Sequence, residues 1–385
     1  MSESRTSGKW NTSFSWLRSL ACIAIVVLHV ASYSMVASTA QGYELSGRQH
    51  AFTSLAQYSC IWAVPVFVMV TGTLLLEPGR ELTWERLRKR YIGRIVKAIV
   101  CFGLLFIAFD FVMNGVEETA NNSVLFAAHP KDLVVGGAGT WLYVLLCTVG
   151  DLLAGHSWPH MWYLYMLLGL YLLMPFFRKV VAYSNKKELR YLVILLTVFL
   201  SLLPLLDLAD VTTDYRFSVA TVYPLYLLLG YALQNEVVLL PRWAAWACLL
   251  VSTVGIWLAV WFLHEDTATL SYFASYNSIL VVLQAASVFG LFCGAGEKRS
   301  ATSDCVGSIS KGTAAPRFLL LFDKCSFGIY MIHYVFVKLL LRYAHLQPFE
   351  EPWLFPVIVF VIVAVSFALT LGYYKVIPIE RVREI

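Results

Sequence analysis

Charged residues are scarce in this chain of 385 residues, at 14%, whereas hydrophobic residues make up 59%. Soluble globular domains average about 25% charged residues, so this composition argues against an ordinary soluble domain. Apolar runs of about 20 residues recur along the chain, and this is the length a helix needs to cross a bilayer core. The sequence therefore predicts a multi-pass membrane protein, surrounded by membrane lipids and without a nucleic-acid partner.

Clustered cysteines are also lacking. The eight cysteines are scattered singly, most of them inside apolar runs, with no Cys-x-x-Cys and no Cys/His cluster. This pattern argues against a disulfide framework and predicts no metal site, so the cysteines are interpreted as small apolar residues. A cleavable signal peptide is not evident either, because the first apolar segment is too long and lacks a small-residue cleavage site. We expect that segment to be a retained first span.

The apolar segments predict an all-α membrane protein of about ten transmembrane helices. They form a single domain, 14–376, between an N-terminal tail, 1–13, and a C-terminal tail, 377–385. The expected spans are 14–36, 54–76, 91–114, 160–182, 188–207, 217–235, 242–263, 271–294, 317–341 and 353–376.

Lysine and arginine favour one set of alternating connections. They concentrate in both tails and in 77–90, 183–187, 236–241 and 295–316, with their flanks. The positive-inside rule therefore places both termini in the cytoplasm. The loop 115–159 then faces outward, and its segment GTWLYVLLCTVGDLLAG is too short for a span. It predicts an interfacial or re-entrant helix before the fourth span.

Two ionisable residues, Arg18 and His29, interrupt the first span. A charge at bilayer depth costs about 2.5–3.5 kcal/mol, so such residues suggest a functional site. Eleven residues make about three helical turns, which points both side chains the same way about 16 Å apart. His29 lies beyond mid-membrane and is a candidate general base, because imidazole titrates near neutral pH. A buried histidine bonded to a neighbouring helix is the alternative.

The ninth span carries a polar stripe of Ser326, Tyr330 and His333, spaced i, i+4 and i+7 on an otherwise apolar helix. This span also starts in the cytoplasm, so His333 is expected at nearly the depth of His29. Matched depth predicts a buried site shared by the two histidines. The alternative is a stripe that serves hydrogen bonding between helices.

Cations continue from the cytoplasmic side into the third span. Arg88 precedes Arg90, Arg94 and Lys97, and the last three are spaced i, i+4 and i+7. A stripe below the interface suits an anionic, phosphate-bearing ligand, because guanidinium binds phosphate bidentately. An anchor for topology or for anionic lipid is the alternative.

Two further segments are candidate site elements. His160, Trp162 and Tyr163 stand at the outer end of the fourth span and form either an interfacial aromatic belt or a platform for carbohydrate. In VPVFVMVTGTLLLEP, Pro65 and Gly72 predict a break in the second span. Broken helices often surround binding sites in membrane proteins.

Taken together and in order, these segments resemble the acyltransferase-3 superfamily of integral membrane acyltransferases over nearly all of 14–342. The resemblance is strongest to short bacterial members, such as the inner-membrane O-acetyltransferase that modifies enterobacterial common antigen. The motifs that carry it are the R-x10-H pair of the first span, VPVFVMVTG, RKRYIGRI, HMWYLYMLLGLYLLMP, YPLYLLLGYAL and SFGIYMIH.

The resemblance implies ten transmembrane helices in the bacterial inner membrane and acyl transfer from cytoplasmic acyl-CoA, expected to be acetyl-CoA. The acceptor would be a hydroxyl of an envelope glycan or lipid-linked sugar. The expected catalytic residues are His29, as base or acyl relay, with Arg18, His333, Tyr330 and Ser326. Donor binding is expected at Arg88, Arg90, Arg94, Lys97 and Glu77, and acceptor binding at His160, Trp162 and Tyr163. Intramembrane histidines and interrupted helices would also fit a transporter or flippase.

Overall fold

The structure is a computed structural model that describes residues 12–40, 46–129, 138–207, 221–263, 270, 272–293, 317–348 and 353–376. Every regular element in these ranges is a helix. Seven helical stretches are long and apolar enough to cross a membrane: Thr12–Val36, Gly47–Leu75, Trp84–Ala128, Trp162–Tyr183, Arg242–Phe262, Arg317–Tyr343 and Leu354–Lys375. The all-helical membrane architecture is thereby confirmed for the described part of the chain.

Three other expected spans are shorter helices. The segment 188–207 holds α9 (Lys186–Thr197), the π-helix η2 (Val198–Leu202) and α10 (Pro204–Asp207), 217–235 holds α11 (Tyr223–Gln234), and 271–294 holds α14 (Ile279–Cys293). The 12 residues of α11 and the 15 of α14 rise about 18 and 22 Å, less than the bilayer core of about 30 Å. The connector 295–316 and the tails, apart from residues 12 and 13, lie outside the described ranges.

The chain divides into two compact units, each described here by itself. The first contains the described residues up to Gly79 together with Arg178–Val376, and the second contains Arg80–Phe177. The remaining helices of the first unit are α1 (Thr12–Ala40), α2 (Gly47–Ser59), α3 (Ala63–Leu75), α12 (Arg242–Phe262), α15 (Arg317–Lys338) with its π-helical continuation η3 (Leu339–Tyr343), and α16 (Leu354–Val376).

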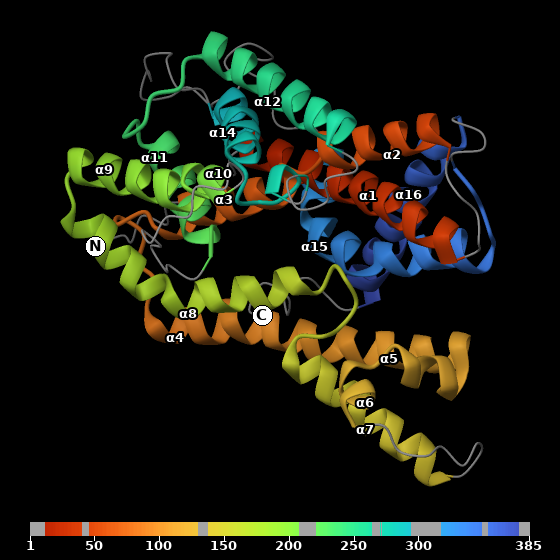
Figure 1. Ribbon diagram of the computed structural model, residues 1–385. Coiled ribbons are helices and arrows are strands. Elements are labelled where there is room, and N and C mark those ends of the chain that lie inside the picture. The colour runs from red at the N-terminus through yellow and green to blue at the C-terminus, as the bar shows by residue number, and fades with distance from the viewer. Residues whose placement is uncertain are drawn as a thin grey trace. The chain divides into compact units, whose positions relative to one another are not determined.

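In the first unit, α1 is the central packing element. It lies against α15 and also contacts α2, α3, α14 and α16. Figure 1 shows red α1 beside blue α15 and α16. The side chains of Leu17, Val26 and Val30 on α1 are fully buried. Because α1 contacts helices from both ends of the chain, its polar residues are placed inside the unit rather than at its rim.

The second expected span is broken, but at a different place from the one predicted. The break is a turn at Cys60–Trp62 between α2 and α3, and Pro65 lies in the first turn of α3, where proline is tolerated. Gly72 lies inside α3, where a Cβ would overlap the backbone of Leu227 on α11. Gly230 of α11 approaches the backbone of Met69 in the same way. Gly72 is therefore required for close packing of α3 on α11, not for the break.

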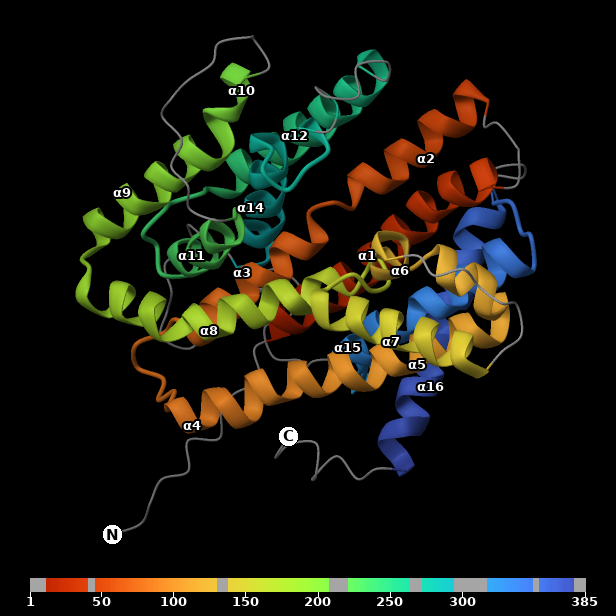
Figure 2. The ribbon, with the colours of Figure 1, turned by 60° about the horizontal axis from the view of Figure 1, so that its bottom comes forward.

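The second unit contains α4 (Trp84–Arg86), the π-helix η1 (Leu87–Ile92), α5 (Gly93–Asn121), α6 (Val124–Ala128), α7 (Ala138–Ala154) and α8 (Trp162–Tyr183) up to Phe177. Figure 2 shows α4 continuing into α5, with η1 between them in the chain. Gly115, with φ 74°, kinks α5 one residue after the expected end of the third span. The segment that was expected to form an interfacial or re-entrant helix forms α7.

Candidate functional site

The seam between α1 and α15 holds, at different levels, the five predicted catalytic residues: Arg18, His29, Ser326, Tyr330 and His333. The thiol of Cys22 on α1 donates to the carbonyl of Ser326 at 3.5 Å. Farther along, the ring centroids of His29 and His333 are 5.3 Å apart, and those of Tyr33 and Tyr334 are 5.7 Å apart. Because residue numbers rise together on both helices, α1 and α15 run parallel.

His29 lies in an aromatic setting. Its ring is tilted by 36° against His333 and stands edge-on to Tyr334, with centroids 5.3 Å apart. His333 is fully buried, whereas His29 keeps partial exposure. Of the two imidazoles, His29 is therefore the one that a ligand could reach.

The tautomer of His333 follows from its backbone contacts. Its Nδ1 lies 2.6 Å from the carbonyl oxygen of Tyr330 and 3.2 Å from that of Ile329. A carbonyl oxygen only accepts hydrogen bonds, so Nδ1 carries the proton and Nε2 holds the lone pair of the neutral ring. The Tyr330 ring is tilted against His333 at 5.9 Å.

Ser326 lies at a different level of the seam from the histidines. Its hydroxyl donates to the carbonyl of Asp323, one turn earlier on its own helix, at 2.8 Å. The seven residues to His333 place the imidazole about 10 Å farther along the axis. The predicted stripe therefore divides into two parts. Ser326 lies beside Cys22, while His333 lies beside His29 and its ring also contacts that of Tyr330.

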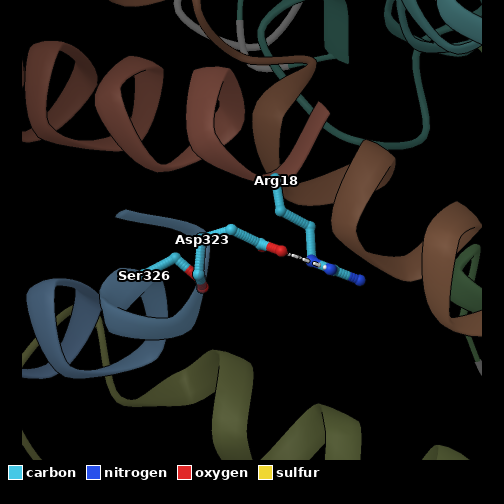
Figure 3. A network of polar contacts seen from close by, with 3 residues as sticks. All are labelled: Arg18, Asp323 and Ser326. Carbon is cyan, nitrogen blue, oxygen red and sulfur yellow. Dashed lines mark hydrogen bonds and ion pairs between the residues drawn. The ribbon is translucent and has the colours of Figure 1, made fainter. Parts of the chain in front are cut away.

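Arg18 forms a bidentate ion pair with Asp323 across the seam. Its Nε donates to Oδ1 and its Nη2 to Oδ2, each at 2.6 Å. The Asp323 side chain is only 1% exposed, while that of Arg18 is 25% exposed. Figure 3 shows the guanidinium reaching the carboxylate, with its far nitrogen directed away from Asp323. Arg–carboxylate pairs of this kind are strong and geometrically specific.

Sequence reasoning missed Asp323. The available signal was its position, since it is a carboxylate in the ninth span, three residues before Ser326. Ionisable residues inside spans are rare and tend to be paired, and the span numbering placed Asp323 near the same surface as Arg18. That combination could have indicated the pair.

The basic candidates all lie in the second unit. Arg88 and Arg90 belong to η1 and are exposed, Arg94 and Lys97 belong to α5, and Arg94 is partly buried. A π-helix takes more residues per turn than an α-helix, so the i, i+4 relation of Arg90 to Arg94 does not follow α-helical geometry. Turns of this type occur frequently at functional sites.

Glu77, the remaining donor-binding candidate, belongs to the first unit. It is exposed just beyond the C-terminus of α3. Its carbonyl oxygen accepts a hydrogen bond from Nη1 of Arg178 at 3.2 Å, and the same nitrogen donates to the carbonyl of Leu75. Arg178 thereby satisfies backbone acceptors at the end of α3.

The aromatic candidates of the second unit are mostly buried. His160 is fully buried and packs against Phe106, with ring centroids 5.3 Å apart. Tyr163 is 8% exposed, and Trp162 is partly exposed. A neighbouring residue that the sequence reading passed over, Trp158, stacks on Phe106 at 4.3 Å and donates from Nε1 to Asp110 at 2.6 Å.

Among the described residues no cluster of three or more His, Cys, Asp or Glu side chains could hold a metal ion.

A comparison with protein families finds that a family model described as an acyltransferase domain, of the acyltransferase-3 type, matches residues 11–371. The match covers α1 to α15 and most of α16. No curated protein and no solved structure matches the chain.

Proposed function

This chain belongs to the acyltransferase-3 family of membrane acyltransferases, and on that premise we propose that it is an acyl-CoA-dependent O-acetyltransferase. The donor is cytoplasmic acetyl-CoA, and the acceptor is a hydroxyl of a cell-envelope glycan or lipid-linked sugar. The observation that carries the proposal is the contact of His29 with His333 at 5.3 Å between ring centroids, inside the region matched by the family. It supplies a reachable base in an aromatic setting within the seam of α1 and α15.

His29 acts as the general base. Its imidazole takes the proton of the acceptor hydroxyl while the hydroxyl oxygen attacks the carbonyl carbon of the thioester. The tetrahedral intermediate then collapses as the carbon–sulfur bond breaks. The departing thiolate takes the proton back from the His29 imidazolium and leaves as the CoA thiol. Base catalysis of this kind contributes about 10²–10⁴-fold to rate.

The neighbouring residues orient the base and stabilise charge. His333 holds the His29 ring by contact, and with its Nδ1 proton on the Tyr330 carbonyl its Nε2 cannot donate to an oxyanion. The Tyr330 hydroxyl, a donor, is better suited to that role. Ser326 supports the seam at the level of Cys22.

The donor phosphates bind the basic residues Arg88, Arg90, Arg94 and Lys97. The exposed Glu77 contributes to donor binding at the cytoplasmic side. The exposed side chains of Arg88 and Arg90 support this assignment, because guanidinium recognises phosphate bidentately. At the acceptor, Trp162 offers a partly exposed ring surface, while the buried His160 and Tyr163 hold the local aromatic packing in place.

We also propose ten membrane crossings, with both termini in the cytoplasm of a bacterial inner membrane. The three shorter elements α9–α10, α11 and α14 complete the ten, since their flanking backbone can be buried in protein rather than in lipid. The test uses two variants in intact cells. Each lacks the eight native cysteines and carries one new cysteine, in place of Lys186 or of His156. Labelling by an impermeant maleimide is expected at position 156 and not at 186, and the reverse pattern contradicts this topology.

Acetyl transfer by purified protein in liposomes tests the function. Acetyl-CoA and an envelope lipid extract are supplied without any ion gradient, and CoA release and acetylated product are measured by mass spectrometry. His29→Ala is expected to lower turnover by about 100-fold or more, whereas the exposed His50 provides the matched control, His50→Ala, with unchanged turnover. Activity retained by His29→Ala contradicts the base assignment, and wild-type protein without gradient-free transfer contradicts the proposed enzyme.

A further inference from the structure

The ion pair between Arg18 and Asp323 suggests a specific part of the donor as its ligand. We propose that Asp323 is a positioning residue that neutralises Arg18 and aims its outer edge at the uncharged, amide-bearing pantetheine arm of the acyl donor. Under this proposal Arg18 does not bind the donor phosphates. The inference rests on the proposed use of acyl-CoA and names which part of that donor the pair contacts.

The first support is charge. Two hydrogen bonds of 2.6 Å join Arg18 to a carboxylate that is 1% exposed, so the pair is close to neutral as a unit. A phosphate approaching Arg18 would also meet the field of Asp323, which is weakly screened in such surroundings. By contrast, Arg88 and Arg90 are exposed and form no ion pair with any described residue. Their charge is therefore not neutralised by a bidentate carboxylate, as that of Arg18 is.

The second support is hydrogen-bonding geometry. A guanidinium carries five N–H donors in a rigid fork, and Asp323 takes one from Nε and one from Nη2. The other donors point away from the carboxylate (Figure 3), on a side chain that is 25% exposed. Neutral amide carbonyls are suitable acceptors for these donors. The carboxylate lies behind the guanidinium, so a ligand meets the fixed fork first.

The third support is position along α1. Arg18 precedes His29 by eleven residues, which is about 16 Å along the helix axis. A donor whose thioester lies at His29 therefore cannot place the same group at Arg18. Between the thioester and the phosphates of CoA lies the pantetheine arm, with its two amides. An arm lying along the seam of α1 and α15 would bring this part of the donor to Arg18.

Two donors distinguish the arm from the phosphates. Acetyl-CoA and S-acetylpantetheine share the arm, and the latter lacks the nucleotide and its phosphates. KM and turnover are measured for both in the liposome assay, with S-acetylpantetheine used as a competitive inhibitor if it is not turned over. The test variant, Arg18→Met/Asp323→Leu, removes both charges together and so does not leave the buried carboxylate or its partner unpaired. Arg90→Ala is the comparison for phosphate binding.

The paired variant is expected to raise KM for acetyl-CoA and KM for S-acetylpantetheine tenfold or more, and by a similar factor. If S-acetylpantetheine is only an inhibitor, its inhibition constant is expected to rise in place of KM. Arg90→Ala is expected to raise KM for acetyl-CoA alone. An increase confined to acetyl-CoA in the paired variant would show that Arg18 binds phosphate and would overturn the inference. Unchanged KM with lower turnover would show a purely structural ion pair and would overturn it as well, as would wild-type protein that does not bind S-acetylpantetheine at all.

The single variant Asp323→Asn tests positioning directly. It leaves Arg18 charged but no longer fixed or neutralised, so binding of the uncharged arm should weaken while attraction to phosphates should grow. The ratio of KM for S-acetylpantetheine to KM for acetyl-CoA is therefore expected to rise at least tenfold, and Asp323→Glu should restore part of it. An unchanged ratio contradicts the positioning role. Wild-type protein that transfers nothing from acetyl-CoA would instead contradict the proposed function.

Discussion

Close packing of α3 on α11 gives a direct test of the fold, because two glycines allow the backbones to meet. A Cβ at Gly72 would overlap the backbone of Leu227, and a Cβ at Gly230 would overlap the backbone of Met69. The atoms in the way belong to the main chain, so a side-chain rotation cannot relieve the overlap. Gly72→Ala and Gly230→Ala are each expected to push the two helices apart.

The cost of this separation can be worked from the packing. Ten residues of α3 and ten of α11 are buried, and a gap of about 0.5–1 Å already loses a quarter to a half of each dispersion contact. Substitutions that overpack a core cost about 1–3 kcal/mol. Alanine returns about 0.5–1 kcal/mol of helix propensity over glycine. The difference between these ranges gives an expected net destabilisation of up to about 2.5 kcal/mol for each variant.

Thermal unfolding in detergent, followed by tryptophan fluorescence, measures the effect. Gly372 on α16 is the matched control, because it is exposed and nothing lies within 4 Å of a Cβ built there. Gly372→Ala should therefore keep or raise the unfolding midpoint, while Gly72→Ala should lower it. Equal midpoints for the two variants would refute the close approach of α3 and α11.

Two further predictions concern the second unit. Asp151 accepts hydrogen bonds from the Ser123 hydroxyl at 2.6 Å and from the backbone N–H groups of Val124 and Leu125 at 3.1 and 3.0 Å. Asp151→Ala should therefore destabilise α6 by about 2 kcal/mol and speed amide hydrogen exchange over 124–128. Slower or unchanged exchange there would contradict this. Trp162→Ala should raise KM for the acceptor without changing the unfolding midpoint. Because His160 is buried, His160→Ala should instead lower the unfolding midpoint by leaving a cavity. A lower midpoint for Trp162→Ala and a higher acceptor KM for His160→Ala would disprove these separate roles.

Much of the helical architecture could be predicted from local sequence. Long apolar runs specify helices wherever backbone groups must be satisfied inside a bilayer. The predicted limit of the third span falls one residue before the Gly115 kink, although α5 continues to Asn121. The break in the second span was less predictable. Pro65 was the apparent breaker, but proline fits the first turn of a helix, and the chain turns instead at Cys60–Trp62.

The depth of each site residue in the membrane could be predicted from its position in its own span, but its contacts with other helices could not. Counting residues from the cytoplasmic side brought His29 and His333 to the same depth, and their rings lie 5.3 Å apart. The same counting does not give the rotation of a helix about its axis. It therefore left Asp323 without a role, whereas the rise per residue already places Ser326 about 10 Å from His333 along the axis.

By itself, the sequence determined the all-helical membrane class, the family motifs and the presence of Arg18 and His29 on one helix. These follow from composition and from spacing within a single helix, where periodicity fixes geometry. Only the tertiary structure decided that α15 lies against α1 in parallel, that Asp323 neutralises Arg18, and that His160 is buried. Those outcomes depend on which helices pack together and in what register, and residues 305 positions apart in the chain carry no local signal of their contact.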